Sequence, residues 1–229
     1  MKKLCSLGIA TLLALALMGC GDEDHHDHHH HHAPAVVEIL SDPTLDGDIT
    51  KDLATGLIGV PSVATNTGNV MAGIDVSPVT GASISESRGF LIFPLAQLPA
   101  NASIQFASIT LFVNNVSLVA SSSAPIPFLL DSIDTVVFPT PIVSGDFDSP
   151  FLMSRSLSFF GSDAGTFVEI KVTSLLADAQ ARLLPQFEVR LLFDQARFLS
   201  DPTTTQGLIA IDDKATDASR APHLHVEFF

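Results

Sequence analysis

The sequence contains no tryptophan and no tyrosine, so its only aromatic side chains besides histidine are 16 phenylalanines. Sugar-binding surfaces favour the two missing residues, because their rings combine an apolar face with a polar group. Cysteine is almost as scarce, since Cys5 and Cys20 are the only two and both lie in the first 20 residues. Beyond Cys20 the chain therefore has no disulfide, no thiolate metal ligand and no cysteine nucleophile.

Basic residues are also few. Against 25 acidic residues the chain has 11 lysines and arginines, which gives a formal net charge of −14. Such an acidic balance argues against nucleic acid as a partner and against charge-driven docking on anionic lipid. Cations or a basic partner suit this chain better.

The motifs of common catalytic sites are missing as well. The sequence has no G-x-S-x-G, no H-E-x-x-H and no glycine-rich phosphate loop. After residue 32 the only histidines are His223 and His225, so a Ser-His-Asp arrangement is not expected. Acidic residues are so abundant that a chance carboxylate pair carries no weight as a glycosidase signal. We expect no enzymatic activity and no required cofactor.

What is present begins with an export signal. Met1-Lys2-Lys3 precedes an apolar run from Leu4 to Met18, which is too short for a membrane span. The residues Leu17-Met18-Gly19-Cys20 resemble the lipobox of bacterial lipoproteins, which implies a signal peptide over residues 1–19 and lipid on Cys20. Gly21, rather than aspartate, follows the cysteine, so the resemblance implies an outer-membrane lipoprotein held by its lipid anchor. An ordinary secretory signal is the alternative.

Residues 20–35 form a low-complexity segment with little to bury, so we expect a tether there. It holds seven histidines: His25, His26, His28, His29, His30, His31 and His32. Beside four acidic residues, these imidazoles suit loose binding of zinc, nickel or copper. Three interpretations stay open: a metal-buffering tether, a soluble spacer, or an engineered tag, which the interruption at Asp27 disfavours.

Residues 36–229 have the pattern of one all-β domain, in which short apolar runs alternate with turn-forming residues. Three of the runs alternate apolar and polar residues, which predicts antiparallel strands with one face buried. One helix is expected over residues 173–184, with Ser174 as its cap and Pro185 at its end. The predicted strands are Val36–Leu40, Val70–Asp75, Arg88–Leu95, Ser103–Asn114, Phe128–Val137, Ser154–Phe160, Phe167–Val172, Phe187–Phe193, Leu208–Ile211 and His223–Phe229.

The predicted strand from Arg88 to Leu95 is apolar on both sides. Its odd-numbered residues point one way, and Phe90 and Ile92 point the other way. One interpretation is a central strand whose second face is covered by a loop or a helix. The other is an exposed ligand-binding patch made of Phe90, Ile92 and Phe112.

Two sets of side chains could hold a metal ion. Asp46 and Asp48 come early and Asp212 and Asp213 come late, and calcium prefers several oxygen ligands of this kind. The alternative is that these aspartates only form turns, for which their Gly- and Pro-flanked positions are suited.

The second set lies on the last strand. His223, His225 and Glu227 share one face of it and could form part of a zinc or copper site. The alternative is a solvated strand face.

The segment Ser87–Val113 also carries a family resemblance. It reads as a strand, a turn around Leu98-Pro99 and a second strand, and it is similar to a motif of DNRLRE-type domains, which are related to family 96 carbohydrate-binding modules. The matching residues are Arg88, Leu91, Phe93, Leu95, Leu98, Pro99, Ala102, Ile104, Ala107, Ile109, Leu111 and Val113. Ile170–Leu176 and Ala221–Phe228 resemble two later motifs of the same group.

The resemblance implies a jelly-roll β-sandwich that serves as a non-catalytic surface module. Some relatives bind acidic polysaccharides. We therefore expect a binding or adhesion module of the cell envelope, with polysaccharide as one candidate ligand. The alternatives are a metal-buffering lipoprotein and a structural partner of another envelope protein.

Overall fold

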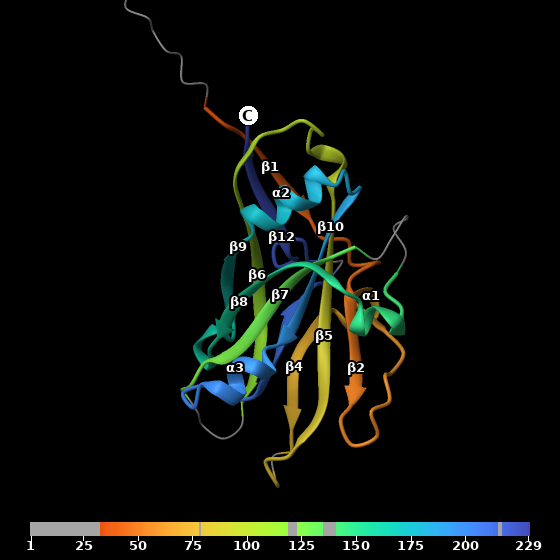
Figure 1. Ribbon diagram of the computed structural model, residues 1–229, viewed down its shortest axis with the longest axis vertical. Helices are drawn as coiled ribbons and strands as arrows, with labels where there is room; N and C mark the ends of the chain where they lie inside the picture. Colours follow the sequence, from red (N-terminus) through yellow and green to blue (C-terminus); the bar gives the residue numbers. More distant parts are fainter. Residues whose placement is uncertain (1–32, 78, 119–122, 135–140, 215–216) are drawn as a thin grey trace, which may run out of the picture. The chain divides into compact units, whose positions relative to one another are not determined.

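The computed structural model describes residues 33–77, 79–118, 123–134, 141–214 and 217–229. In this part of the chain the fold is mostly β, with one strongly curled antiparallel sheet and a few short helices (Figure 1). The prediction of an all-β, antiparallel class is confirmed. The strands are β1 (Ala35–Leu40), β2 (Gly47–Asp52), β3 (Ser62–Val63), β4 (Asn69–Val76), β5 (Ser83–Pro94), β6 (Ile104–Leu118), β7 (Ile126–Ile133), β8 (Phe151–Phe159), β9 (Thr166–Lys171), β10 (Gln186–Phe193), β11 (Gly207–Asp212) and β12 (His223–Phe228).

The strand order along the sheet is β1-β12-β6-β11-β4-β5-β10-β7-β8, with β9 added to β6 and β2 added to β5. Strand β5 joins the two halves of this path, because its first part pairs with β4 and its second part with β10. The change occurs at Gly89, where a Cβ atom would lie 2.8 Å from a methyl group of Val70. The absence of a side chain there lets β5 and β4 approach closely.

All ten predicted strands are present, with shifted ends, and residues 135–137 of the predicted strand Phe128–Val137 lie outside the described residues. Two strands were missed, β2 and the two-residue β3. The sequence of β2, GDITKD, has a single apolar residue, Ile49, so periodicity gives no signal for it. Its strand conformation follows from pairing along β5, where Gly47 lies opposite Phe90 and Asp52 opposite Ser85. The turn near Leu98-Pro99 contains the 3-10 turn η1 (Leu95–Gln97), but β6 pairs with β12, β11 and β9 rather than with β5.

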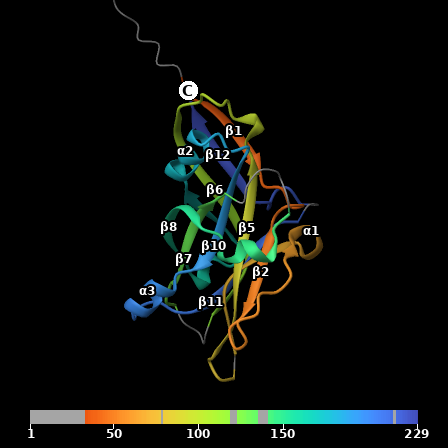
Figure 2. The same cartoon turned by 45° about the vertical axis from the view of Figure 1, so that its right-hand side comes forward.

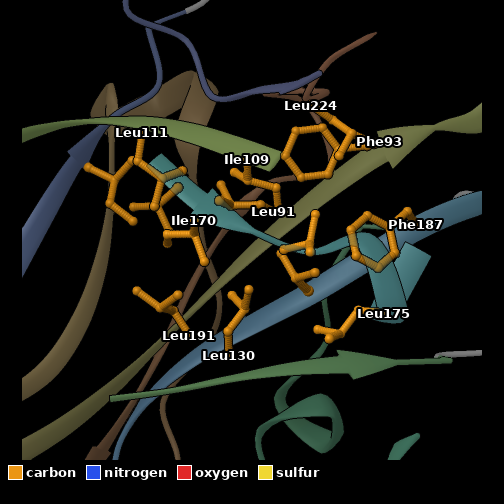
Figure 3. Close-up of a cluster of buried hydrophobic side chains, with 14 of the residues drawn as sticks. Leu91, Phe93, Ile109, Leu111, Leu130, Ile170, Leu175, Phe187, Leu191 and Leu224 are labelled. Atoms are coloured by element: carbon orange, nitrogen blue, oxygen red, sulfur yellow. The ribbon is translucent and has the colours of Figure 1, made fainter. Parts of the chain in front are cut away.

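The main core lies inside the curl of the sheet. Figure 3 shows leucine, isoleucine and phenylalanine side chains of β5, β6, β7, β9, β10 and β12 converging there, together with Leu175 of α2. The predicted alternation is confirmed in β6, since Ala107, Ile109, Leu111 and Val113 are all buried in this core. Burial of each large apolar side chain stabilises the fold by about 1.5–3 kcal/mol.

A second, smaller core covers the opposite face of β5. Phe90 and Ile92 have exposed fractions of 0% and 1%, and they pack with Ile49, Ile133, Ile142 and Phe147. The cover is the segment that contains the 3-10 turn η2 (Ser144–Asp148). The alternative of an exposed patch is therefore wrong for Phe90 and Ile92, and Phe112 is also buried, with an exposed fraction of 9%. The covered central strand is the correct interpretation.

Two arginines fasten η2 onto the sheet. The guanidinium carbon of Arg88 lies 3.9 Å from the centre of the Phe147 ring, and its Nη1 donates to the Phe147 carbonyl and to Asp148 Oδ1. Arg190, which is buried, donates from Nη1 to the carbonyls of Phe147 and Ser149 at 3.0 and 2.8 Å. These bonds hold a loop, rather than a helix or strand, as the cover of a sheet face.

Three short α-helices occur in the described residues: α1 (Ala64–Thr67), α2 (Thr173–Ala181) and α3 (Gln195–Ser200). Figures 1 and 2 show α2 near β12 at one end of the sheet and α3 beside β7. The predicted helix over residues 173–184 is confirmed as α2, but Leu183 adopts a φ of +58° and the helix ends before Arg182. Ser174 is not its cap. The N-cap is Val172, and Thr173 Oγ1 instead accepts from the Ala107 N–H at 2.9 Å.

Contacts divide the chain into Met1–Ala33 and Pro34–Phe229, and the second unit contains every strand named above. None of the helices in the described residues is long and apolar enough to cross a membrane. Cys20 and the seven histidines of the tether lie outside the described residues.

Candidate functional site

One candidate site is the outer face of β1, β12, β6 and β9, away from the main core. Pairing places Glu38 of β1 opposite His225 of β12, and His225 opposite Ser108 of β6, which in turn lies opposite Lys171 of β9. Because side chains alternate along a strand, residues two apart on each strand share this face. We call outer face the set Glu38, Phe106, Phe112, Phe167, Lys171, His223, His225 and Glu227.

His225 lies between two carboxylates on this face. Its Nδ1 is 2.5 Å from Glu38 Oε1, and its Nε2 is 3.4 Å from Glu227 Oε1. The hydrogen bond to Glu38 raises the pKa of His225 above its ordinary value, and Glu227 raises it further, while partial burial opposes both. The imidazole is therefore more readily protonated here than in water.

The predicted metal site on this strand is not assembled. The Nδ1 atom of His225 already faces the Glu38 carboxylate, and its Nε2 atom faces the Glu227 carboxylate. Two of the predicted ligands, His225 and Glu227, therefore contact each other. In the described part of the chain, no group of three or more His, Cys, Asp or Glu side chains is arranged to hold a metal ion. His223, His225 and Glu227 do share a strand face, as predicted.

Phenylalanine rings alternate with these charges. The Phe106 ring lies 6.1 Å from the His225 ring, and the Lys171 ammonium lies 5.7 Å from the same Phe106 ring. Further along the face, Phe112 and Phe167 meet edge to face at 5.0 Å, and Phe167 is 55% exposed. The face thus combines apolar ring surface with donors and acceptors of both charges.

Arg220 connects this face to a second candidate site. Its guanidinium carbon lies 4.3 Å from the centre of the Phe112 ring, and its Nη1 lies 3.7 Å from Asp212 Oδ2. Asp212 ends β11 and is fully buried. The next residue, Asp213, is also fully buried and donates its N–H to the Gly68 carbonyl, directly after α1.

This second site is a cluster of buried carboxyls between the β1–β2 loop and the end of β11. The Ser41 N–H donates to the Pro222 carbonyl, which brings the β1–β2 loop beside the start of β12. Asp46 Oδ1 accepts from the Ile92 N–H at 2.7 Å, which fixes this side chain against β5. The carboxyl of Asp213 lies next to that of Asp46, and the Ser41 hydroxyl lies beside both. Two of the four aspartates predicted for calcium, Asp46 and Asp213, are thereby neighbours, and the charge of Asp212 acts on Asp213 from nearby.

The electrostatics of the cluster are unfavourable to ionised carboxyls. Burial raises the pKa of Asp46 well above its ordinary value, and the neighbouring charge of Asp213 raises it further. Burial also raises the pKa of Asp213. The fourth predicted aspartate, Asp48, stands apart: its Oδ1 accepts from the Met71 N–H at 3.1 Å, and burial raises its pKa to about 6.

An apolar cleft of about 270 Å³ lies between η1 and the end of α2. Leu95, Leu98 and Leu184 line it, with exposed Leu183 at its side. Its one polar side chain, Gln180, donates to the Pro99 carbonyl. The cleft therefore lacks the convergent polar groups that would define a small-molecule ligand.

Sequence reasoning missed several members of both sites. Strand alternation could have placed Glu38, Phe106 and Lys171 on this face, because each occupies the polar or outward position of an alternating strand. Ser41 and Arg220 carry none, since both lie in connections between strands and join the sites only through the fold.

Comparison of the chain with protein-family models gives no match, and comparison with curated proteins gives none either. The resemblance to DNRLRE-type domains therefore stays a prediction from the sequence motif.

Proposed function

We propose that this chain is a non-catalytic envelope lipoprotein whose β domain is a jelly-roll-type module that binds polysaccharide through its outer face. The lipobox-like residues Leu17–Cys20 support the proposed location, which is the outer membrane, with lipid attached to Cys20. The sharing of β5 between two halves of the curled sheet supports the jelly-roll class, because both halves enclose one main core.

The arrangement of the outer face carries the binding proposal. Sugar rings offer apolar C–H faces and hydroxyl groups, so a glycan needs ring surface beside hydrogen-bonding groups. The exposed ring of Phe167 and the Phe106 ring between Lys171 and His225 supply both. Lys171 and Arg220 also lie on a face of an otherwise acidic protein, where they suit the carboxylates of an acidic polysaccharide.

A glycan array probed with the full chain in detergent tests this proposal. We expect retention on a subset of acidic polysaccharides, weakened at least tenfold in Phe167→Ala and in Lys171→Ala. Phe151→Ala is the matched control, because Phe151 is similarly exposed but lies on β8, at the other end of the strand order. Uniform silence of the array, or equal loss in the control, would contradict the proposal.

A second candidate function is docking to another envelope protein, and a specific surface favours it. The start of the β2–β3 connection meets the end of the β4–β5 turn near the lower end of Figure 1, and exposed aliphatic side chains belong to both segments there. The Leu53 N–H donates to the Ile84 carbonyl there, so the two connections are neighbours. Leu53, Leu57 and Ile84 are 39%, 71% and 45% exposed, and Leu57 lies beside this bond because its carbonyl accepts from the Asp52 N–H. Exposed apolar groups in one place mark surfaces that contact a partner.

Cross-linking in native membranes separates the two candidates. A docking role predicts a defined cross-linked complex that disappears in Leu57→Asp. Leu199→Asp, which changes an equally exposed side chain of α3, should leave the complex intact. Glycan retention without any complex would favour the first candidate alone.

A further inference from the structure

Unpartnered oxygen atoms set the carboxyl cluster apart from an ordinary group of surface aspartates. Asp46 Oδ2 and both carboxylate oxygens of Asp213 are buried and have no hydrogen-bond partner among the described residues. The Ser41 hydroxyl beside them is in the same condition. Both aspartates have an exposed fraction of 0%, so bulk water does not replace the missing partners.

Nearby cations do not satisfy these oxygens. Lys214 and Arg220 approach the cluster, but their contacts of 3.8 and 3.7 Å go to Asp212 Oδ2. Among the described residues no ion pair reaches Asp46 or Asp213 within 4 Å, while the charges of Asp42 and Asp212 act on Asp213 from nearby. A buried carboxylate without a partner is strongly unfavourable, so this arrangement favours a bound positive charge.

We propose that Asp46, Asp213 and the Ser41 hydroxyl bind a calcium ion, which joins the β1–β2 loop to the end of β11. Carboxylate and hydroxyl oxygens are hard ligands, and this set contains no nitrogen or sulfur that would favour zinc or copper. Calcium accepts irregular sets of six to eight oxygens, including main-chain carbonyls, so two carboxyls suffice as its charged ligands. Magnesium is a poorer fit, because it keeps several of its own waters and this site is fully buried.

The consequence of such a site is a cross-link between distant parts of the sequence. Ser41 and Asp46 lie about 170 residues before Asp213 in the chain. The segments already meet through main-chain hydrogen bonds, from Ser41 to Pro222 and from Asp213 to Gly68. A shared ion would therefore add a second link between the β1–β2 loop and the end of β11.

Thermal unfolding of the full chain, dialysed against EGTA and then titrated with calcium chloride, tests the proposal. Calcium at a hundredfold excess over its Kd should raise the Tm by about 5–10 °C. Asp46→Asn and Asp213→Asn, which keep the side-chain shape, should each abolish the rise. Asp48→Asn is the matched control, because Asp48 is a buried aspartate of β2 outside the cluster, and its calcium response should equal that of the wild type.

Calorimetric titration of the wild type with calcium gives a second measurement, in which we expect one strong site that is lost in Asp213→Asn. Both variants retain the acidic residues of the tether, so weak binding there cannot imitate the loss. The competing arrangement is a proton shared between Asp46 and Asp213. No heat and no change in Tm for the wild type would overturn the calcium site in favour of that proton. Equal responses in wild type and both cluster variants would overturn it as well.

Discussion

At the scale of single residues, a main feature of this protein is a set of buried ionisable side chains. Asp46, Asp48, Asp131, Arg190, Asp212 and Asp213 are all at most 5% exposed. The groups around these side chains differ. Arg190 and Asp131 form an ion pair, Asp48 accepts one main-chain hydrogen bond, and the carboxyls of Asp46 and Asp213 are neighbours. Asp212 lies near Lys214 and Arg220. These differences decide how each substitution will act.

Asp48→Asn should stabilise the protein at neutral pH. The folded-state pKa of Asp48, about 6, lies above the ordinary value of 3.8, so its contribution to stability is present below pH 3.8 and is lost as the pH rises through 6. Asparagine can still accept from the Met71 N–H and does not ionise. The variant should therefore gain about 1–3 kcal/mol over the wild type between pH 4 and pH 8. Urea unfolding across this range measures the gain, and a pH-independent difference would contradict the assignment.

Arg190→Met should be among the most damaging single changes. Arg190 Nη2 donates to Asp131 Oδ2 at 2.8 Å across the β10–β7 pair, and both side chains are buried. Removing one partner leaves a buried charge and costs about 3–5 kcal/mol. Asp131→Asn in the same chain should recover part of this loss, and chemical denaturation of the two single variants and the double variant measures the coupling. Purely additive losses would show that the ion pair contributes nothing.

At the scale of elements, strand β5 and its cover explain most of the architecture. Its sequence is apolar on both sides because it faces two cores, with Leu91 and Phe93 in the main core and Phe90 and Ile92 in the second. The resemblance motif Ser87–Val113 spans β5 and β6, and its matched residues are mainly buried. That motif therefore carries more information about the fold than about a ligand.

Phe147→Ala tests whether η2 is a structural cover. Phe147 is fully buried, and Arg88 stacks on its ring. Loss of the ring should destabilise the domain by about 3–5 kcal/mol and expose Phe90 and Ile92. Phe151→Ala, a change just beyond the same loop at a residue that is 58% exposed, should cost less than about 1 kcal/mol. Denaturant unfolding gives both values, and equal effects would show that η2 is not a cover.

At the scale of the whole molecule, the proposals combine an export signal, a histidine-rich segment and one β domain. The outer face and the calcium cluster meet at Arg220, which contacts Phe112 on one side and Asp212 on the other. The proposed calcium site would therefore lie close to the proposed glycan surface. The positions of these two sites could not be read from the order of residues in the chain. The outer face, for example, is made by β1, β6, β9 and β12, which come from the two ends and the middle of the domain sequence.

Cys20→Ala should release the protein from membranes. Lipid on this cysteine is the only anchor that the sequence predicts, and the acidic chain is not expected to adhere to anionic lipid by charge. Fractionation of cells that express each form should find the wild type in the membrane pellet and the variant in the soluble fraction. Cys5→Ala is the control, since Cys5 lies within the predicted signal peptide. Membrane retention of Cys20→Ala would contradict the lipoprotein assignment.

The sequence by itself determined the β class, ten of the strands and the one longer helix, because alternation and turn residues are local signals. It also singled out Asp46, Asp48, Asp212 and Asp213 as calcium-ligand candidates, which stays a prediction. Only the tertiary structure decided that Asp48 stands apart, that His225 lies between Glu38 and Glu227, and that a loop covers Phe90 and Ile92. These outcomes depend on which strands pair, and pairing joins residues far apart in the chain through burial that no short segment records.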